Sequence, residues 1–140
     1  MLPITQIFRL VKSEDLNHHG TFFAGRCSEW FVESGFICVA RKLAPNNIVC
    51  LKVHGLAFLH PVHLGDILCF ESRIVKTGRS TLTVYVTVKE EKTGNLIYTD
   101  GFITFCHVDL NTKSQAHGLS IKPETEEEIQ LFERAKNLPA

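Results

Sequence analysis

A single carboxylate, Glu33, stands in the middle of a long apolar segment, shortly after an Asn-His-His-Gly cluster that begins at Asn17. Its neighbours three and four positions away include no Lys or Arg, so no ion pair within a helix would neutralise it. Burying an unpaired carboxylate is costly, and carboxylates in such surroundings serve as general bases or nucleophiles. Two other interpretations stay open: a Lys or Arg from another element pairs with Glu33, or its side chain reaches water.

The Asn-His-His-Gly cluster supplies groups that would complete a site around this carboxylate. Asn17 offers an amide donor, and His18 or His19 offers an imidazole, the side chain whose ordinary titration lies closest to neutral pH. The cluster leads directly into a predicted helix, where the backbone N–H groups near Gly25 and Arg26 would face and stabilise an oxyanion. The alternative interpretation of two adjacent loop histidines is a solvent-exposed turn.

The remaining histidines and the cysteines do not form a recognisable metal site. His60 and His63 lie close together, but no third ligand follows at a spacing typical of zinc, so we predict no metal. The cysteines are odd in number, widely spaced and without a C-x-x-C pair, which indicates buried thiols in a reducing compartment. They are Cys27, Cys38, Cys50, Cys69 and Cys106.

Length and charge narrow the class of protein further. The chain has 140 residues with 15 basic and 15 acidic side chains, which predicts one domain without formal net charge. Nucleic-acid binding through the backbone needs an excess of basic charge, so we expect no such partner. The N-terminus does not resemble a signal peptide, and no apolar run approaches the roughly 20 residues that cross a bilayer. We therefore expect a soluble cytoplasmic protein.

Hydrophobic periodicity predicts two helices that differ in character. The Pro-free segment 26–43 is apolar on nearly all sides in its later turns, which is typical of a buried helix, and Pro45 ends it. The segment 124–138 predicts a short amphipathic helix with a capping box formed by Thr125 and Glu128. Its expected apolar stripe consists of Ile129, Phe132 and Ala135.

The other regular segments alternate or are rich in β-branched residues, as strands are. They lie at 4–12, 48–59, 67–76, 81–91 and 96–108. We expect the last four to form an antiparallel meander. Only one internal helix is available to cover the inner face of such a sheet, so the economical arrangement wraps the sheet around that helix. The sequence thus predicts one α+β domain over 1–140, with its core at about 4–110.

Four stretches in this order resemble the hot-dog-fold acyl-CoA thioesterases. The entry DLNHHGTFFAGRCSEW is similar to the family's loop into its helix, and VHGLAFLHPVHLGD to its characteristic strand. VKTGRSTLTVYVTV resembles the strand entry that approaches coenzyme A, and PETEEEIQLFERAK resembles the acidic C-terminal helix of the acyl-CoA hydrolase branch. The resemblance covers nearly the whole chain.

The resemblance implies an antiparallel sheet wrapped around one long buried helix, with a short C-terminal helix in addition. It also implies homodimers that share a continuous sheet, with active sites at their interface and with tetramers or hexamers possible. The implied reaction is hydrolysis of an acyl-CoA thioester, with no metal and no redox cofactor. Coenzyme A phosphates would meet Arg79, with Lys76 and Ser80 near it, and the pantetheine arm would pass the backbone of His54 and Gly55. The alternative interpretation of TGRS is a polar hairpin turn.

The chain departs from the family pattern at the position of the acid. The acyl-CoA hydrolase branch carries an Asp where this chain has Val32, and the 4-hydroxybenzoyl-CoA thioesterase branch carries an acid where this chain has Asn17. Compared instead with plant acyl-ACP thioesterases, Asn17, His19 and Glu33 fall on functional positions.

We therefore expect Glu33 to act as general base or nucleophile, Asn17 to orient the water or the carbonyl, and His19 to assist. A hot-dog dehydratase or hydratase and a non-catalytic acyl-CoA-binding module are the alternatives.

Overall fold

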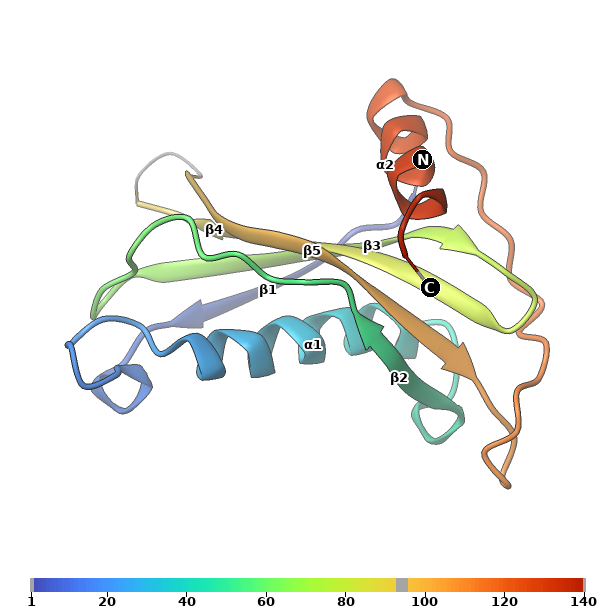
Figure 1. Cartoon of the computed structure of the whole chain (residues 1–140), viewed down its shortest axis with the longest axis horizontal. Coiled ribbons are helices and arrows are strands. Elements are labelled where there is room, and N and C mark those ends of the chain that lie inside the picture. The colour runs from blue at the N-terminus through green and yellow to red at the C-terminus, as the bar shows by residue number, and fades with distance from the viewer. Residues whose placement is uncertain (1, 93–95, 140) are drawn as a thin grey trace.

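The computed structural model describes residues 2–92 and 96–139, which form one five-stranded sheet and two α-helices (Figure 1). The strands are β1 (Thr5–Leu10), β2 (Ile48–Val53), β3 (Ile67–Thr77), β4 (Thr81–Glu90) and β5 (Leu96–His107). The helices are α1 (Ala24–Ala40) and α2 (Glu126–Lys136), and short 3₁₀ turns lie at Ser13–Asp15 and Pro45–Asn47.

The strand order is β1-β3-β4-β5-β2, with every neighbouring pair antiparallel. The predicted four-strand meander is wrong for β2, which pairs with β5 at the far edge instead of with β3. After β2 the chain stays beside β5, because the His54 N–H donates to the Phe102 carbonyl and the Leu59 N–H to the Tyr98 carbonyl. Strand 48–59 was therefore predicted too long: its second half follows β5 as an irregular segment.

One face of α1 packs against the concave side of the sheet, as expected for the hot-dog arrangement (Figure 1). The buried face is made of Cys27, Trp30, Phe31, Ser34, Gly35, Cys38 and Val39. A methyl group on Gly35 would lie 2.9 Å from the Cδ1 of Ile103, so glycine permits the close approach of α1 to β5. The helix begins two residues earlier and ends three residues earlier than predicted. It is not buried on all sides, because Phe36 and Ile37 are partly exposed.

The outer face of the sheet is covered in part by α2. Leu131 and Ala135 pack with Val75, Tyr85 and Phe102, together with Leu2 from the N-terminus. The predicted stripe is right for Ala135 and wrong for Ile129, which is 46% exposed. Phe132 is only half-buried.

The predicted capping box of α2 is present and explains why a carboxylate occupies the buried face of the helix. The hydroxyl of Thr125 accepts from the Glu128 N–H at 3.1 Å, and the Glu128 carboxylate accepts from the Thr125 N–H at 3.2 Å. Its other oxygen accepts from the Leu2 N–H at 2.7 Å. The buried carboxylate therefore joins the start of α2 to the N-terminal segment.

The structure also bears on the predicted burial of the cysteines and on the expectation that no segment crosses a membrane. All five thiols are free, and Cys27, Cys38, Cys69 and Cys106 are buried as expected. Cys50 is exposed on the edge strand β2, so the prediction of burial is wrong there. In the described part of the chain, no helix is long and apolar enough to cross a membrane.

The bonds to Glu128 predict a specific acid sensitivity of α2. The Leu2 N–H, followed by the Glu124 and Thr125 N–H groups, lowers the pKa of Glu128 to about 2. Because this pKa is below that of an unfolded glutamate, about 4.3, the stabilisation is present above that pH and is lost as pH falls toward 2. The difference in melting temperature between wild type and Glu128→Gln should be largest at neutral pH and shrink below about pH 4. The exposed Glu126→Gln serves as control, and a difference independent of pH would contradict the account.

Candidate functional site

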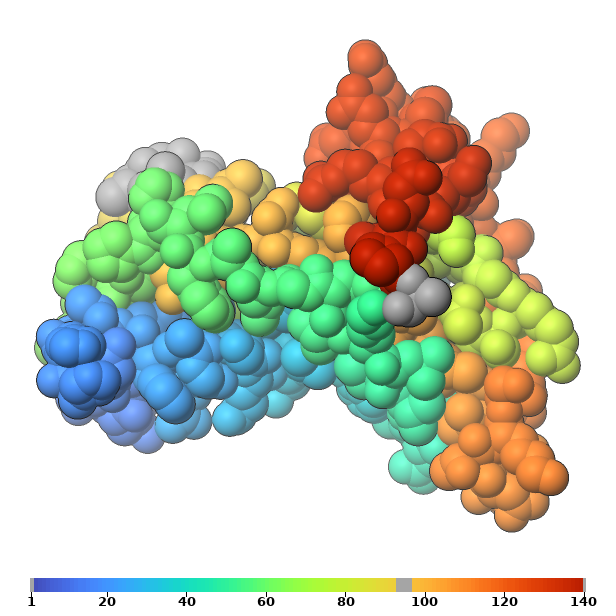
Figure 2. Space-filling model, in the orientation of Figure 1, coloured from blue at the N-terminus to red at the C-terminus, as the bar shows by residue number. Residues whose placement is uncertain are grey.

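A groove of about 320 Å³ lies at the N-terminal end of α1, where the loop before the helix meets the segment that follows β2. The Phe22 N–H donates to the Val62 carbonyl at 2.8 Å and joins the two segments. Figure 2 shows these segments in contact at one end of the molecule. The groove is lined by Asn17, Thr21, Phe22, Ala24, Phe58, Leu59, His60, Pro61, Val62 and Tyr98. Most of these side chains are aromatic or aliphatic, but Asn17, Thr21 and His60 make the exposed surface of the groove about as polar as it is apolar.

Asn17 holds the entrance loop closed. Its side-chain oxygen accepts from the His19 N–H at 2.8 Å and from the Thr21 N–H at 3.2 Å, while its amide donates to the Thr21 hydroxyl at 3.1 Å. Gly20 at the turn has φ +79°, a conformation that favours glycine. Most of the hydrogen-bonding capacity of Asn17 is therefore used within the loop, and one amide hydrogen remains for a ligand.

The two histidines of the loop lie at the surface of the molecule. His18 and His19 are both exposed, and their ring centroids lie 3.9 Å apart. Neither side chain lines the groove. In a single copy of the chain, the interpretation of this cluster as a solvent-exposed turn therefore fits. An assisting role for His19 in catalysis stays a prediction.

Asp15, which the sequence analysis did not single out, anchors the entry into α1. Its side chain is 3% exposed, accepts from the Lys12 N–H at 2.9 Å, and pairs with the Arg26 guanidinium at 3.3 Å. Its backbone carbonyl accepts from the Phe23 N–H at 2.9 Å. The signal available in the sequence was an acid close to a helix start.

The two backbone N–H groups predicted to face an oxyanion at the start of α1 differ in their hydrogen bonds. The Arg26 N–H donates to the Phe23 carbonyl at 3.0 Å and is occupied in this conformation, so its role as oxyanion donor stays a prediction. The Gly25 N–H has no hydrogen-bond partner among the residues described, as expected for the first turn of a helix. A methyl group on Gly25 would lie 2.6 Å from the Phe23 ring, so only glycine leaves this ring in place.

Glu33 is neither unpaired nor buried. Its carboxylate accepts a hydrogen bond from the Arg9 guanidinium of β1, and its side chain is 49% exposed. Arg9 also lies 5.0 Å from the centre of the Trp30 ring. The premise of a desolvated carboxylate is therefore wrong, and the alternative of a cation from another strand is correct. Glu33 lies outside the groove, about 13 Å along the helix axis from Ala24.

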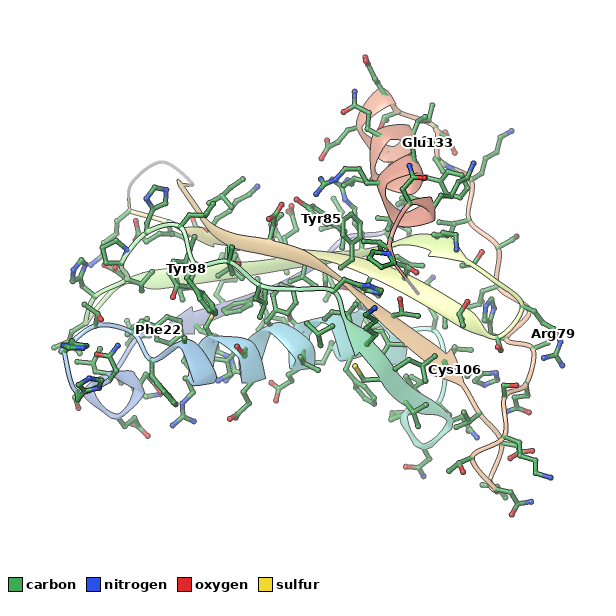
Figure 3. All side chains as sticks on the ribbon, viewed as in Figure 1. Phe22, Arg79, Tyr85, Tyr98, Cys106 and Glu133 are labelled. Atoms are coloured by element: carbon green, nitrogen blue, oxygen red, sulfur yellow. The ribbon has the colours of Figure 1, made fainter. Side chains whose placement is uncertain are left out.

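Tyr98 is a groove residue that the sequence analysis missed. It is 4% exposed, and its ring centroid lies 6.1 Å from that of Phe22 and 5.5 Å from that of Phe58. Figure 3 shows Tyr98 and Phe22 facing each other between the sheet and the N-terminal half of α1. Burial raises the pKa of Tyr98 to about 12, so its hydroxyl stays protonated at neutral pH.

The residues predicted to meet coenzyme A lie away from this groove. Lys76 is near the end of β3, and Arg79 and Ser80 form the hairpin between β3 and β4, at the opposite end of the molecule from Tyr98 (Figure 3). Arg79 is exposed, and no ion pair of its guanidinium is found in the described ranges. The hairpin-turn interpretation is correct for the backbone, and phosphate binding stays a prediction.

His54 and Gly55 follow β2 and lie beside β5. The His54 ring nitrogen Nε2 lies 2.7 Å from the Thr104 hydroxyl, and burial, followed by the charge of Lys52, lowers the pKa of His54. Gly55 has φ +81°, and its carbonyl would lie 2.9 Å from a methyl group on Gly101. The two residues thus fix the path of the edge segment.

The family is decided by comparison with known proteins. A family model described as the thioesterase superfamily matches residues 19–97. The chain belongs to the thioesterase superfamily.

This thioesterase also has curated relatives and solved neighbours of similar length. An uncharacterized acyl-CoA thioester hydrolase of Bacillus subtilis is 32% identical over 124 residues, which are 86% of this chain and 71% of the relative. Another from Haemophilus influenzae is 27% identical, with 88% of this chain and 83% of the relative covered. The crystal structure of an apo-hexameric acyl-CoA thioesterase superposes with a TM-score of 0.85 at 29% identity, covering 95% of this chain and 86% of that one. The predicted family and hot-dog fold are confirmed, and the names of these relatives agree with the predicted acyl-CoA hydrolase activity.

A second cavity of about 320 Å³ lies at the other end of α1 in this thioesterase. Cys38, Arg41 and Lys42 of α1 and the segment after it line one side, and the chain before α2 lines another. None of the predicted site residues lies there. No group of His, Cys, Asp or Glu that could hold a metal is found among residues 2–92 and 96–139.

The bonds of Asn17 predict different effects for two substitutions. Asn17→Ala removes every side-chain bond that closes the loop and should lower the free energy of unfolding by about 1–3 kcal/mol. Asn17→Asp keeps both acceptors for the His19 and Thr21 N–H groups and should cost much less. Urea denaturation of the two variants checks this. Equal losses of stability would show that the oxygen of Asn17 does not hold the loop.

Proposed function

We propose that this thioesterase hydrolyses an acyl-CoA thioester to the free acid and coenzyme A, with the thioester carbonyl bound in the groove at the start of α1. The observation that carries the proposal is the combination of a groove lined mainly by aromatic and aliphatic side chains with a free backbone N–H, that of Gly25, at a helix N-terminus. Such an N–H, together with the helix dipole, stabilises the negative charge that forms on a carbonyl oxygen during acyl transfer.

The proposed reaction requires only a water, a proton acceptor and an oxyanion donor. Water adds to the carbonyl carbon while the base takes one of its protons, and negative charge collects on the oxygen. The carbon–sulfur bond then breaks, coenzyme A leaves as thiolate, and the proton held by the base neutralises the thiolate. Coenzyme A is part of the substrate, and we expect no resident cofactor or metal.

Glu33 is our candidate for the base, and it requires a second copy of the chain. In one protomer it lies outside the groove, about 13 Å along α1 from Ala24. Arg9 also draws its carboxylate toward β1, away from the β2 edge. The assignment therefore needs the Glu33 side chain to turn from Arg9 toward a neighbouring protomer, where Asn17 and His19 would orient the water.

A homo-oligomer with a dimer as its minimum unit is supported by the exposed edge of the sheet. Leu51 and Val53 of β2 are exposed, and so are Phe58 and Leu59 on the segment that follows. An apolar edge strand with unpaired backbone groups favours pairing with another strand. A solved thioesterase of similar fold is hexameric.

Twofold pairing of two copies through β2 would also bring the residues proposed to bind coenzyme A close to the groove of the other copy. Tyr98 lies beside Val88 and Lys89, about 23 Å along β4 from Thr81 and the Arg79 hairpin. Antiparallel pairing reverses one chain relative to the other, so the hairpin of one copy approaches the end at which the other has its groove. Arg79, with Lys76 and Ser80, would then bind the phosphates, and His54 and Gly55 would border the pantetheine arm. Free thiols and an acyl-CoA substrate fit a cytoplasmic location.

The role of Glu33 is tested by acyl-CoA turnover. On a panel from acetyl- to palmitoyl-CoA plus benzoyl-CoA, Glu33→Gln should lower kcat by about a hundredfold or more, because it removes the proton acceptor. Free coenzyme A is measured by chromatography, since native thiols would react with a thiol reagent. Glu29→Gln, an exposed acid one turn earlier in α1, is the matched control. Full activity of folded Glu33→Gln would exclude Glu33 as base and leave Asn17, His19 and the groove histidine His60 to be tested.

The role of Arg79 is tested by comparing two substrates that share an acyl group. Arg79→Ala should raise KM for acyl-CoA about tenfold or more, as expected for loss of a charge-assisted bond to phosphate. It should leave kcat unchanged and have no effect on an acyl-pantetheine, which lacks the nucleotide. Lys136→Ala removes a cation from α2 on the outer face and serves as control. An equal rise in KM for both substrates would contradict phosphate binding.

A further inference from the structure

The side-chain orientation of Tyr98 results from an irregularity in the pairing of β4 with β5. Val88 of β4 pairs with Thr99 of β5, but the next residue, Lys89, pairs with Ile97, so Tyr98 is the extra residue of a β-bulge. Without the bulge, alternation would place Tyr98 on the same face as Asp100, whose carboxylate accepts from Tyr85 on the outer side of the sheet. The bulge instead turns the Tyr98 ring to the inner side, against Phe22. Bulges that redirect a side chain in this way are frequent beside active sites.

The hydroxyl of Tyr98 has no hydrogen-bond partner among the residues that the structure describes, although the side chain is almost wholly buried. A buried tyrosine usually finds such a partner. Among the described residues, the side-chain polar atoms that are fully buried and have no hydrogen-bond partner are His54 Nδ1, Thr87 Oγ1 and Thr99 Oγ1. The Tyr98 oxygen is not one of them, and the residue lines the groove, so this oxygen remains accessible from the groove.

The surroundings of this hydroxyl match the needs of an acyl thioester. Phe22 and Phe58 pack on the Tyr98 ring and supply apolar contact for an acyl group. Asn17 lines the same groove with its one remaining amide hydrogen, and α1 begins there with the free Gly25 N–H. Because burial keeps the phenol protonated, it can donate to a carbonyl oxygen throughout the neutral range.

We infer that the Tyr98 hydroxyl donates a hydrogen bond to the carbonyl oxygen of the acyl thioester bound in the groove. The inference rests on the proposed function and adds to it a catalytic side chain outside the loop and helix motifs. The same hydrogen bond strengthens as the oxygen becomes negative, so Tyr98 contributes to the transition state as well as to binding.

The test compares Tyr98→Phe with Tyr85→Phe, which removes the hydroxyl of another buried tyrosine. Tyr98→Phe should lower kcat/KM by about a hundredfold and leave the melting temperature unchanged or higher, because it removes a buried group without a partner. Tyr85→Phe removes the bond to Asp100 on the outer face and should lower the melting temperature with little effect on kcat/KM. If the Tyr98 hydroxyl had only a structural role, Tyr98→Phe would lower the melting temperature and kcat/KM together. Loss of a catalytic contact alone lowers kcat/KM without lowering the melting temperature.

Failure of this inference is separable from failure of the proposed function. If wild type turns over acyl-CoA and Tyr98→Phe retains full kcat/KM, the hydroxyl does not contact the carbonyl, while the hydrolase proposal stands. If wild type is inert on the whole panel, calorimetric binding of an acyl-CoA analogue with methylene in place of sulfur still tests Tyr98. Tyr98→Phe should weaken that binding about tenfold, and an unchanged affinity would overturn the inference.

Discussion

The burial of one face of α1 against the concave side of the sheet fixes the position of every other part of the site. Gly35 lets the helix approach Ile103, and Gly101 leaves room for Phe31 and for the edge backbone at Gly55. These contacts hold α1 at one height and one rotation above β5. The N-terminal end of α1 therefore lies at the same end of the molecule as the start of β5, which carries the bulge (Figure 1).

Around that junction, charged and polar side chains mostly serve to hold the backbone. Asp15 anchors the start of α1, Asn17 closes the loop before it, and Arg9 forms an ion pair with the Glu33 carboxylate. The groups left for a ligand in the groove are few: the Gly25 N–H, one amide hydrogen of Asn17, the Tyr98 hydroxyl and the imidazole of His60. In the proposed complex these neutral donors would polarise the carbonyl without a charged side chain in the groove lining, and they would act more strongly once the bound acyl group displaces water.

Local patterns predicted the elements well, and tertiary pairing accounts for the errors. Alternation identified β4, and Thr125 with Glu128 predicted the start of α2, because both signals lie within a few neighbouring residues. The pairing of β2 with β5 depends on the path of 54–66, which no local pattern encodes. Glu33 was expected to be unpaired because a helical wheel shows only its own helix, whereas Arg9 comes from β1.

Tyr98 escaped the sequence analysis for a related reason. In a regular strand it would share a face with Asp100, and only the one-residue slip against β4 separates them. The histidines attracted attention by their chemistry, yet His18 and His19 lie outside the groove. The predicted turn at KTGN lies largely outside the described residues. The fold could thus be predicted from hydrophobic periodicity and from the family resemblance. The position of Tyr98 in the groove could not, because it depends on the pairing register between β4 and β5.

The central claim is that the acyl thioester binds at the start of α1, between Tyr98 and the entrance loop. A crystal structure with the methylene analogue of an acyl-CoA tests it most directly. We expect the carbonyl oxygen within hydrogen-bond distance of the Tyr98 hydroxyl and the Gly25 N–H, with the phosphates at Arg79 of a second copy. An acyl chain bound instead in the cavity beside Cys38 and Arg41 would contradict the account.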